Sequence, residues 1–566
     1  MTGNTTVANY PVNGGRVVMG KETGDGAGWA PAVTKGSKAA VDGAALDAVF
    51  AALDTTHLPG VAVGVALDGV PLYRKGFGLA SLELPVTLSP TIRMRIGSTT
   101  KHFGALAYML LVEAGLAGLD DPVARHVPEM ARAAAGVTMR QLMTHVSGLR
   151  CSLELALQLS GPGHPLSTAD CMRLMADDDD VNFPAGEEWC YNNGGYVLLS
   201  LAIERLSGMR LGDFFRDRLF RPLGMNDTLL RLVDTDYVPN SASLHMVDGK
   251  GGYYRQPIGA EIAAEGGIVS TVDDMLRWLA HLRAALAGRP TVGSAETWRR
   301  MVEPAVLANG YVTGYGLGLM DTPYRGVRTV HHAGGVMGGS SQMITLPDHG
   351  LDIIVMANRA GLDPIDLAAR VIDACVPTLG PKLEPHEGVI PTGTYYCPHN
   401  GGTFGLARHE GKAIISMGGM GLSLVRTPDG LLRPNVVVFH MGLDVPETAA
   451  PPKTLRGVEF GVERELVLLE PDPAADLRSL AGRYVAAASG TTAVVEPDGD
   501  GRTGRLVLTG RHGTLRHRLA NLAPGLWDAK PLDLPVPIVG GLIAFDSQGF
   551  TFNSGRTRRL RFRKVS

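Results

Sequence analysis

The 566-residue sequence is poor in cysteine, in net charge and in long apolar runs, and each shortage excludes a class of protein. Five cysteines, an odd number without a C-x-x-C pair, argue against a disulfide framework or a zinc site and favour reduced thiols, so we expect no metal. The net charge of −3 lacks the basic excess of a nucleic-acid binder. No apolar run approaches the roughly 20 residues that span a bilayer, so we expect no membrane partner.

The first part of the chain, residues 1–42, lacks helical and strand periodicity and is rich in glycine and threonine. It has no apolar stretch behind basic residues of the kind found in secretory signals, so we expect a cytoplasmic protein. The sequence therefore predicts a flexible N-terminal arm over 1–42.

From residue 43 onward the chain predicts a body of mixed helices and strands. Apolar residues at helical spacing predict helices near 46–53, 98–118, 138–143, 196–206, 211–220 and 271–286. Strands are expected at 61–67, 70–74, 316–320, 341–345 and 351–357. Because successive helices are not separated by strands, a regular βαβ alternation does not fit, and we expect an α+β domain over 43–376: an antiparallel sheet with surrounding helices.

The helical pattern stops at a proline-marked linker, residues 377–390. Beyond it, short alternating runs between Gly, Pro and Asp turns predict all-β structure, either a barrel or a sandwich. The similar openings Gly393-Thr394-Tyr395 and Gly482-Arg483-Tyr484 suggest two β-units, 391–471 and 472–566.

The sharpest local motif is Gly97-Ser98-Thr99-Thr100-Lys101, which starts a long apolar helix. Residues i and i+3 share a helix face, so the Ser98 hydroxyl and the Lys101 amine can meet. A serine becomes nucleophilic when a base takes its proton, and a lysine is such a base only where burial or nearby cations lower its pKa. Lysine occurs only eleven times in this chain. Taken alone, however, S-x-x-K is more often an N-cap serine with a surface lysine.

Further motifs follow in a definite order. They are Thr144-His145-Val146-Ser147-Gly148-Leu149, Tyr191-Asn192-Asn193, Gly266-Gly267-Ile268, Tyr315-Gly316-Leu317-Gly318 and His331-His332-Ala333-Gly334-Gly335. Together with S-x-x-K they resemble the serine β-lactamase and penicillin-binding-protein superfamily (peptidase family S12), in its class C and D-Ala-D-Ala carboxypeptidase-like branch. The H-x-G motif followed by two β-units is similar to the three-domain D-stereospecific aminopeptidases. This resemblance implies a β-lactamase-like catalytic domain followed by two antiparallel β-barrels, the last of which sends a loop into the active site.

The resemblance also implies roles for single residues. Ser98 would attack the acyl carbonyl, while Lys101 and Tyr191 would share the proton, either as a neutral lysine or as a phenolate. Asn193 would hold Lys101 and the substrate amide. His332 would orient Tyr191 or the leaving group with less fixed charge than a lysine.

Three further positions complete the predicted site. The backbone N–H groups of Ser98 and Gly335 would form the oxyanion hole. His331 is the alternative to its neighbour His332. Asp533, followed by apolar residues and prolines, is similar to the family's aspartate that binds the free amine of the substrate, with a surface turn as the alternative.

The sequence therefore predicts a serine hydrolase of the EC 3.4.11 class that acts through an acyl-enzyme without a cofactor. Its partner would be a small peptide, amide or ester, from which it releases an N-terminal D-amino acid or glycine. An esterase, a β-lactamase-like or a D-Ala-D-Ala carboxypeptidase-like hydrolase is the alternative on the same residues. A non-catalytic penicillin-binding or scaffold protein is the alternative of another class. The resemblance further suggests a homodimer.

Overall fold

The computed structural model describes residues 7–8, 39–160, 166–178, 180–417, 420–435, 440–533 and 540–565. Of the arm predicted over 1–42, only Val7–Ala8 (β1) and residues 39–42 lie within the described part, and β1 pairs in parallel with β18 (Met420–Arg426). None of the described helices is long and apolar enough to cross a membrane.

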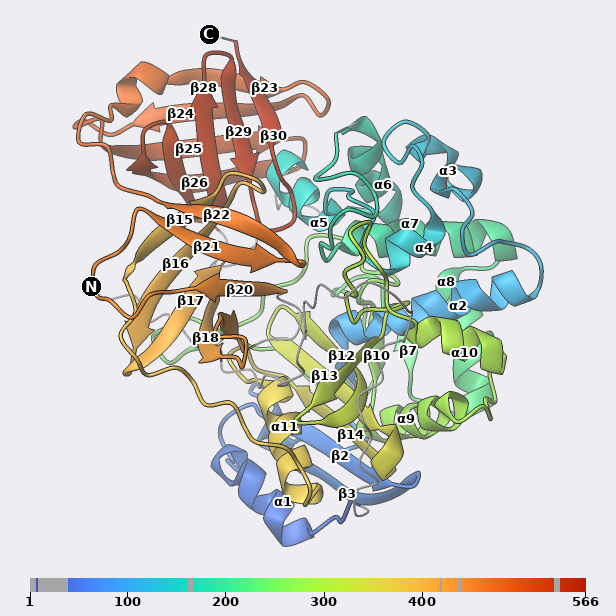
Figure 1. Cartoon of the computed structure of the whole chain (residues 1–566). Coiled ribbons are helices and arrows are strands. Elements are labelled where there is room, and N and C mark those ends of the chain that lie inside the picture. Colours follow the sequence, from blue (N-terminus) through green and yellow to red (C-terminus); the bar gives the residue numbers. More distant parts are fainter. Residues whose placement is uncertain are drawn as a thin grey trace, which may run out of the picture.

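A six-stranded antiparallel sheet lies at the centre of the first part of the chain (Figure 1). In spatial order its strands are β11 (Met320–Tyr324), β12 (Val327–Val336), β13 (Gly339–Leu346), β14 (Leu351–Ala357), β2 (Val61–Leu67) and β3 (Val70–Phe77). One face packs against α1 (Gly43–Phe50) and α11 (Pro364–Cys375). The other face packs against α9 (Val272–Leu286), so closely that a Cβ on Gly64 would come within 2.5 Å of Val272. The sheet is therefore covered on both faces.

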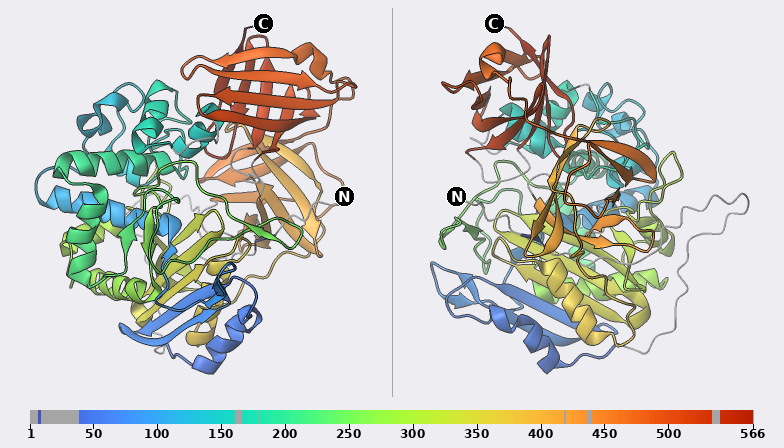
Figure 2. Two further views of the ribbon diagram at one scale, coloured as in Figure 1. Left: turned by 180° about the vertical axis from the view of Figure 1, so that it is seen from behind. Right: turned by 60° about the vertical axis from the view of Figure 1, so that its left-hand side comes forward.

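The remaining helices gather beside this sheet (Figure 2). They are α2 (Lys101–Glu113), α3 (Val123–His126), α4 (Met139–Met143), α5 (Ser152–Leu155), α6 (Thr168–Asp177), α7 (Asn193–Ser207), α8 (Leu211–Phe215) and α10 (Ala295–Val302), with η1 (Ala51–Leu53), η2 (Gly97–Thr100), η3 (Pro128–Met130), η4 (Ala156–Ser160), η5 (Arg216–Phe220), η6 (Arg221–Leu223) and η7 (Pro347–His349). Helix α2 is buried along almost its whole length and packs against α7. Its first residue, Lys101, therefore lies inside the protein.

One predicted strand is wrong. Residues 316–319 form a turn, and the strand begins only at Met320. Gly318 has a φ of +75°, and a Cβ there would come within 2.8 Å of the His102 backbone. Glycine lets this turn lie directly on the start of α2, a long-range contact that the local alternation of apolar residues does not reveal.

A small three-stranded sheet holds the segment that leads into Ser98. Strand β6 (Met94–Arg95) pairs with β10 (Ile268–Ser270), which also pairs with β7 (Leu229–Leu230). Two further pairs are β4 (Leu79–Ser81) with β5 (Val86–Thr87) and β8 (Met246–Val247) with β9 (Tyr253–Tyr254). Because β6 ends two residues before Gly97, its pairing fixes where the helix of Ser98 begins.

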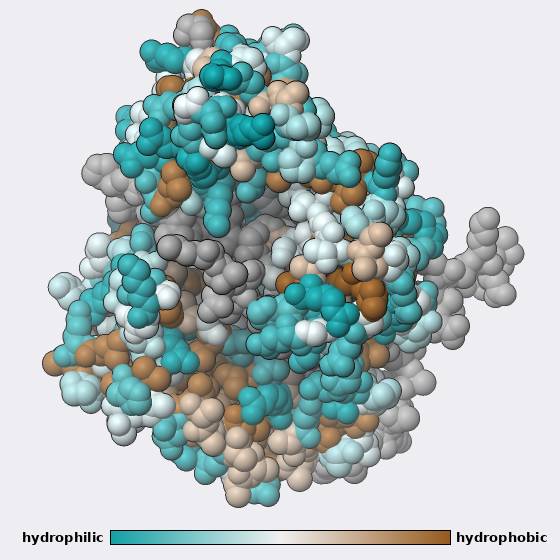
Figure 3. All heavy atoms as spheres, turned by 90° about the vertical axis from the view of Figure 1, so that its left-hand side faces the viewer, coloured by the Kyte–Doolittle hydropathy of each residue, from teal (hydrophilic) through white to brown (hydrophobic). Residues whose placement is uncertain are grey.

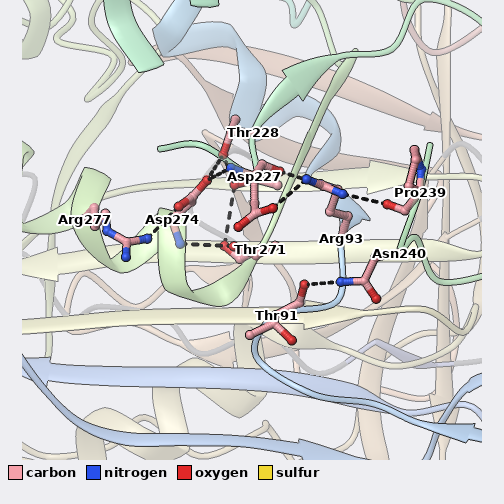
Figure 4. Close-up of polar contacts among 10 residues, drawn as sticks. Thr91, Arg93, Asp227, Thr228, Pro239, Asn240, Thr271, Asp274 and Arg277 are labelled. Carbon is pink, nitrogen blue, oxygen red and sulfur yellow. Dashed lines mark hydrogen bonds and ion pairs between the residues drawn. The ribbon is translucent and has the colours of Figure 1, made fainter. Parts of the chain in front are cut away.

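Polar contacts anchor this small sheet to α9 (Figure 4). The buried carboxylate of Asp274 accepts hydrogen bonds from the Asp227 N–H and the Thr228 hydroxyl, both at 2.8 Å. Arg277 pairs with the same carboxylate at 2.7 Å. Beside it, Arg93 donates to the Asp227 carbonyl at 2.9 Å. The buried acid Asp274 thus joins the segment before β7 to α9, and Asp227 in turn connects this segment to Arg93, which precedes β6.

The rest of the chain forms two closed eight-stranded antiparallel barrels, as the resemblance implied. The first contains β15 (Gly393–Cys397), β16 (Gly402–His409), β17 (Lys412–Met417), β18, β19 (Leu432–Pro434), β20 (Met441–Asp444), β21 (Thr454–Glu459) and β22 (Val462–Leu468), and the β18–β19 pairing closes it. The second, after η8 (Leu477–Leu480), contains β23 (Gly482–Ala486), β24 (Thr491–Pro497), β25 (Thr503–Gly510), β26 (Gly513–Ala523), β27 (Leu526–Pro531), β28 (Gly541–Asp546), β29 (Gly549–Asn553) and β30 (Leu560–Lys564).

The C-terminal barrel docks on the helical part of the molecule. Strands β25 and β26 contact η4, and the Thr491 hydroxyl donates to the Leu159 carbonyl at 2.5 Å. Figure 3 shows that the top of the molecule, formed by this barrel, is mostly hydrophilic on the face drawn, whereas apolar side chains are more frequent lower down. The second barrel thus reaches the catalytic body without an intervening element.

We expect Asp274→Ala to lower the midpoint of thermal unfolding, because it leaves the Asp227 N–H without its acceptor and the Thr228 hydroxyl with the Ser270 hydroxyl as its remaining described partner. Such a loss costs about 1–3 kcal/mol. The control is Asp273→Ala, whose partner Arg74 is half exposed, so that pair contributes little. Differential scanning calorimetry compares the two variants, and equal destabilisation would contradict the anchoring role of Asp274.

Candidate active site

The turn that carries Ser98 is built by backbone contact with β12. Gly97 has a φ of +54°, and a Cβ there would come within 2.7 Å of the Gly335 nitrogen. The Thr99 hydroxyl donates to the His332 carbonyl at 3.2 Å. Ser98 itself is partly exposed. The turn therefore presents the Ser98 hydroxyl beside the glycines of β12.

The Lys101 amine lies at the centre of the site and is completely buried. Its Nζ lies 3.2 Å from Ser98 Oγ, 2.8 Å from Asn193 Oδ1 and 2.6 Å from the Glu265 carbonyl oxygen. A neutral amine has two hydrogens and one lone pair. The Asn193 side-chain oxygen and the Glu265 carbonyl can accept hydrogen bonds from the two N–H groups. The lone pair can then accept a hydrogen bond from the Ser98 hydroxyl.

Burial lowers the pKa of Lys101, because a charged ammonium loses its hydration there. The buried carboxyl of Glu265 opposes this shift, and the positive charge of Arg556 adds to it. Burial in turn raises the pKa of Glu265, which weakens its opposition. Together these effects lower the pKa of Lys101, which favours the neutral amine, the form that can accept the proton of Ser98.

Tyr191 covers the Lys101 amine with its ring. The Lys101 Nζ lies 4.7 Å from the ring centroid. The Tyr191 hydroxyl is buried and has no hydrogen-bond partner among the described residues. Burial raises the pKa of Tyr191, and the neighbouring Ser98 and Arg556 only partly offset this. The phenol therefore keeps its proton, which favours Lys101 over a Tyr191 phenolate as the base.

A chain of hydrogen bonds joins the Tyr191 segment to β12 through two histidines. The Asn192 N–H donates to His145 Nδ1 at 3.1 Å. The Tyr315 hydroxyl lies 3.1 Å from His145 Nε2 and 2.9 Å from His332 Nε2. His332 Nδ1 lies 2.6 Å from the Ala333 carbonyl, so this nitrogen carries the hydrogen. One consistent arrangement follows, in which His145 donates to Tyr315 and Tyr315 donates to His332.

Burial keeps both histidines of this hydrogen-bond network, His145 and His332, neutral. It lowers the pKa of His332 to about 3, and it lowers the pKa of His145 well below its usual value. His331 points instead to Thr322, whose hydroxyl lies 2.9 Å from its Nε2. The register of β12 thus brings His332, not His331, to the site. His332 contacts Tyr315, whereas the prediction had it orient Tyr191 or the leaving group.

Gly335 lies on β12 next to the Ser98 turn. A Cβ on Gly335 would meet no atom within 4 Å, whereas one on Gly334 would come within 1.8 Å of the Ile96 carbonyl oxygen. Gly335 is exposed. Its backbone therefore borders open space beside Ser98, where the sequence predicts the oxyanion hole.

Asp533 has no described contact with these residues. Its carboxylate accepts a hydrogen bond from the Arg516 N–H at 2.8 Å and pairs with the Arg516 guanidinium at 3.2 Å. Residues 534–539, the rest of the loop predicted to enter the active site, lie outside the described part of the chain. The described contacts of Asp533 thus remain on its own barrel.

A different loop of the C-terminal barrel reaches the site. Residues 554–559 join β29 to β30, and the Arg556 guanidinium carbon lies 4.9 Å from the Tyr191 ring centroid. The sequence offers no local signal for this contact, because it forms between residues more than 350 positions apart. Tyr315 and Glu265, in contrast, lie in or beside motifs that were visible in the sequence.

Glu188, three residues before Tyr191, joins all three parts of the molecule. Its carboxylate lies 2.8 Å from Arg558 of the second barrel and 2.5 Å from His399 of the first. Burial raises the pKa of Glu188, but Arg558 and His399 outweigh this effect and hold the pKa below its ordinary value. The segment of Tyr191 is thus fixed by an ion pair with the second barrel and a hydrogen bond with the first.

The described residues contain no group of three or more His, Cys, Asp or Glu side chains that could hold a metal ion.

The sequence and the fold of this chain are similar to those of known proteins. The Beta-lactamase family model matches residues 46–376. Penicillin-binding protein 4* of Bacillus subtilis is 30% identical over 338 residues, which are 56% of this chain and 71% of that protein. A D-aminopeptidase of Cereibacter sphaeroides is 27% identical over 511 residues, covering 87% of this chain and 93% of that protein.

Among solved structures, the octameric penicillin-binding protein homologue from Pyrococcus abyssi aligns with 91% of this chain and 98% of its own. The TM-score is 0.50 and the identity 22%. This similarity concerns the fold.

We expect Glu188→Gln to destabilise the protein, since it leaves the buried Arg558 without its counter-charge. Breaking such a pair costs about 3–5 kcal/mol. The pKa of Glu188 is lower in the folded protein, so its contribution is complete above pH 4.5 and is lost as the pH falls through the folded-state value. Calorimetry at pH 7 and in mild acid measures both effects.

The control for Glu188→Gln is Glu496→Gln, which removes a half-exposed pair with Arg505 on the second barrel. That variant should unfold close to the wild-type midpoint. A Glu188→Gln protein with the same midpoint would contradict the role of Glu188 in docking the barrels.

Proposed function

The chain belongs to the beta-lactamase family, and from this premise we propose that it is a serine hydrolase that releases N-terminal D-amino acids or glycine from small peptides, amides or esters. The observation that carries the proposal is the buried Lys101 amine, 3.2 Å from Ser98 Oγ, with its pKa lowered. The similarity to a D-aminopeptidase over 87% of this chain and 93% of that protein supports the choice of substrate.

The reaction would proceed through an acyl-enzyme on Ser98. Neutral Lys101 takes the Ser98 proton as the oxygen bonds to the carbonyl carbon of the substrate. The resulting oxyanion accepts hydrogen bonds from the N–H groups of Ser98 and Gly335. When the C–N bond breaks, the proton passes from Lys101 to the leaving nitrogen, with the Tyr191 hydroxyl as the relay. Water, deprotonated by Lys101, then releases the acyl group.

His332 would serve this reaction through position and not through charge. Its pKa of about 3 keeps it neutral at ordinary pH. Through Tyr315 and His145 it is connected to Asn192, the neighbour of Tyr191. Asn193 would hold the Lys101 amine and the substrate amide.

We expect hydrolysis of D-alanine p-nitroanilide and little hydrolysis of the L-enantiomer. The measurement is the release of p-nitroaniline, with Ser98→Ala as the inactive control. Equal rates on both enantiomers, or faster hydrolysis of the L-form, would reject the D-aminopeptidase function. Absence of any turnover would revive the non-catalytic penicillin-binding alternative.

Asp533 is the proposed anchor of the substrate amine. Asp533→Asn should raise KM for D-alanine p-nitroanilide and leave KM for p-nitrophenyl acetate, which has no amine, nearly unchanged. An equal effect on both substrates would favour a surface role for Asp533 and the esterase alternative.

The pH dependence tests which residue is the base. Since burial lowers the pKa of Lys101, activity should rise with pH and reach half its maximum well below 10.5, the ordinary lysine value. Glu265→Gln removes the carboxylate that favours the charged ammonium and keeps the carbonyl that binds Lys101. The rise should therefore move to lower pH, as measured by kcat/KM from pH 5 to 10.

Two outcomes of that experiment would contradict Lys101 as the base. One is a rise near or above pH 10, which would point to a Tyr191 phenolate. The other is a Glu265→Gln profile that coincides with the wild type.

We also propose the setting in which the protein works. All five cysteines are free, in keeping with a cytoplasmic protein. Residues 377–390 contain no helix or strand, which supports domain limits at 43–376, 391–471 and 472–566. The homodimer rests on the family resemblance alone, and sedimentation equilibrium would test it.

A further inference from the structure

The loop of residues 554–559 is fixed to the catalytic body by its backbone. The Arg556 carbonyl accepts hydrogen bonds from the Asn182 side-chain amide at 2.9 Å and from the Cys151 N–H at 3.3 Å. The Arg556 N–H donates to Glu154 Oε2 at 3.0 Å. Figure 1 shows α5, which contains Glu154, beside this barrel. The side chain of Arg556 thus extends from an anchored backbone.

The guanidinium of Arg556 has no hydrogen-bond or ion-pair partner among the described residues, although it lies over the Tyr191 ring. The residue is partly exposed, so a ligand can reach it. A guanidinium offers a rigid fork of donors that matches the two oxygens of a carboxylate. Its donors are therefore available at the edge of the catalytic centre.

The nearest acid does not neutralise this cation. Glu154 uses Oε2 to accept from the backbone of Arg556 and from the Ser554 hydroxyl, and Oε1 has no partner among the described residues. Burial raises the pKa of Glu154, which favours its uncharged form. The space beside Tyr191 therefore keeps a positive charge, which attracts an anion and repels an ammonium group.

The leaving group of the substrate lies on this side of the scissile bond. The proton that Lys101 removes from Ser98 returns to the leaving nitrogen by way of Tyr191, so that nitrogen has to be close to the Tyr191 hydroxyl. In a peptide, the α-carboxylate of the leaving amino acid is two bonds from this nitrogen. The amine of the released residue belongs to the acyl part, on the other side of the bond.

We propose that Arg556 binds the carboxylate of the leaving amino acid, so that the preferred substrates are dipeptides with an N-terminal D-residue and a free C-terminus. This assignment rests on the proposed function. It explains why a loop of an appended barrel brings a cation to the edge of the active site.

The test compares two substrates that differ only in the leaving group. D-alanylglycine ends in a carboxylate, and D-alanylglycinamide ends in a neutral amide. The measured quantity is the ratio of their kcat/KM values, obtained from the release of D-alanine on the plateau of the pH profile. Arg556→Met should reduce this ratio roughly tenfold to a hundredfold, as expected for a charged hydrogen bond. Arg556→Lys should retain part of it.

The matched control is Arg563→Met on β30 of the same barrel, where the arginine side chain makes one described hydrogen bond, to Gln548. The ratio of the two kcat/KM values should be the same in Arg563→Met as in the wild type. If both rates fall together in Arg556→Met and the ratio is unchanged, Arg556 acts only by lowering the pKa of Lys101, and the proposal is overturned. A wild-type ratio of one also overturns it. Should Arg556→Met not fold, the wild-type and Arg556→Lys ratios decide.

A second readout separates this proposal from the proposed function. If neither peptide is cleaved, the substrate assignment under the proposed function fails, and Ser98-dependent hydrolysis of p-nitrophenyl acetate is measured instead. N-acetylglycine should then inhibit more strongly than N-acetylglycinamide, and Arg556→Met should remove the difference. Equal inhibition of the wild type by both compounds would overturn carboxylate binding at Arg556.

Discussion

Burial of the Lys101 amine is the constraint on which the rest of the site depends. An ammonium group deprived of water is unstable, so the interior of the protein favours the neutral base that Ser98 needs. The acceptors Asn193 and Glu265 lie on segments far apart in the chain, and each satisfies one hydrogen of the amine. The packing of α2 against α7 and the pairing of β6 with β10 together maintain this arrangement.

The two barrels take part in the same arrangement through charge. Glu188 fixes the segment before Tyr191 by an ion pair with Arg558 of the second barrel and a hydrogen bond with His399 of the first. Arg556 brings a cation near Lys101, and this lowers the pKa of the amine further. Removing the C-terminal barrel would therefore change the electrostatics of the active site. In this sense, the two barrels contribute to the position and the electrostatics of the candidate catalytic residues.

Much of the fold followed from local signals in the sequence. Apolar periodicity located helices such as α7 and α9 and the strands β2, β13 and β14, and the order of these elements indicated the α+β body. The local pattern left open whether the two β-units are barrels or sandwiches, and the family resemblance implied barrels. The strand expected at 316–320 was wrong, because Gly318 fits against α2 in a contact that no local pattern encodes. S-x-x-K predicted that Ser98 and Lys101 would meet, since i and i+3 share a helix face.

The parts of the site that the sequence missed depend on contacts between distant segments. Tyr315 stood in a motif, but its position between His145 and His332 follows only from the folded strands. Arg556 resembles any other arginine of a β-hairpin, and only the docking of the barrel reveals its proximity to Tyr191.

The central claim is that Ser98, deprotonated by a neutral Lys101, forms a covalent acyl-enzyme. The direct measurement is intact-protein mass spectrometry after brief reaction with a fluorophosphonate probe, followed by peptide mapping. We expect one adduct on Ser98 in the wild type, none in Ser98→Ala and a strongly slowed reaction in Lys101→Met. An adduct on another residue, or labelling of Ser98 at the wild-type rate without Lys101, would contradict it.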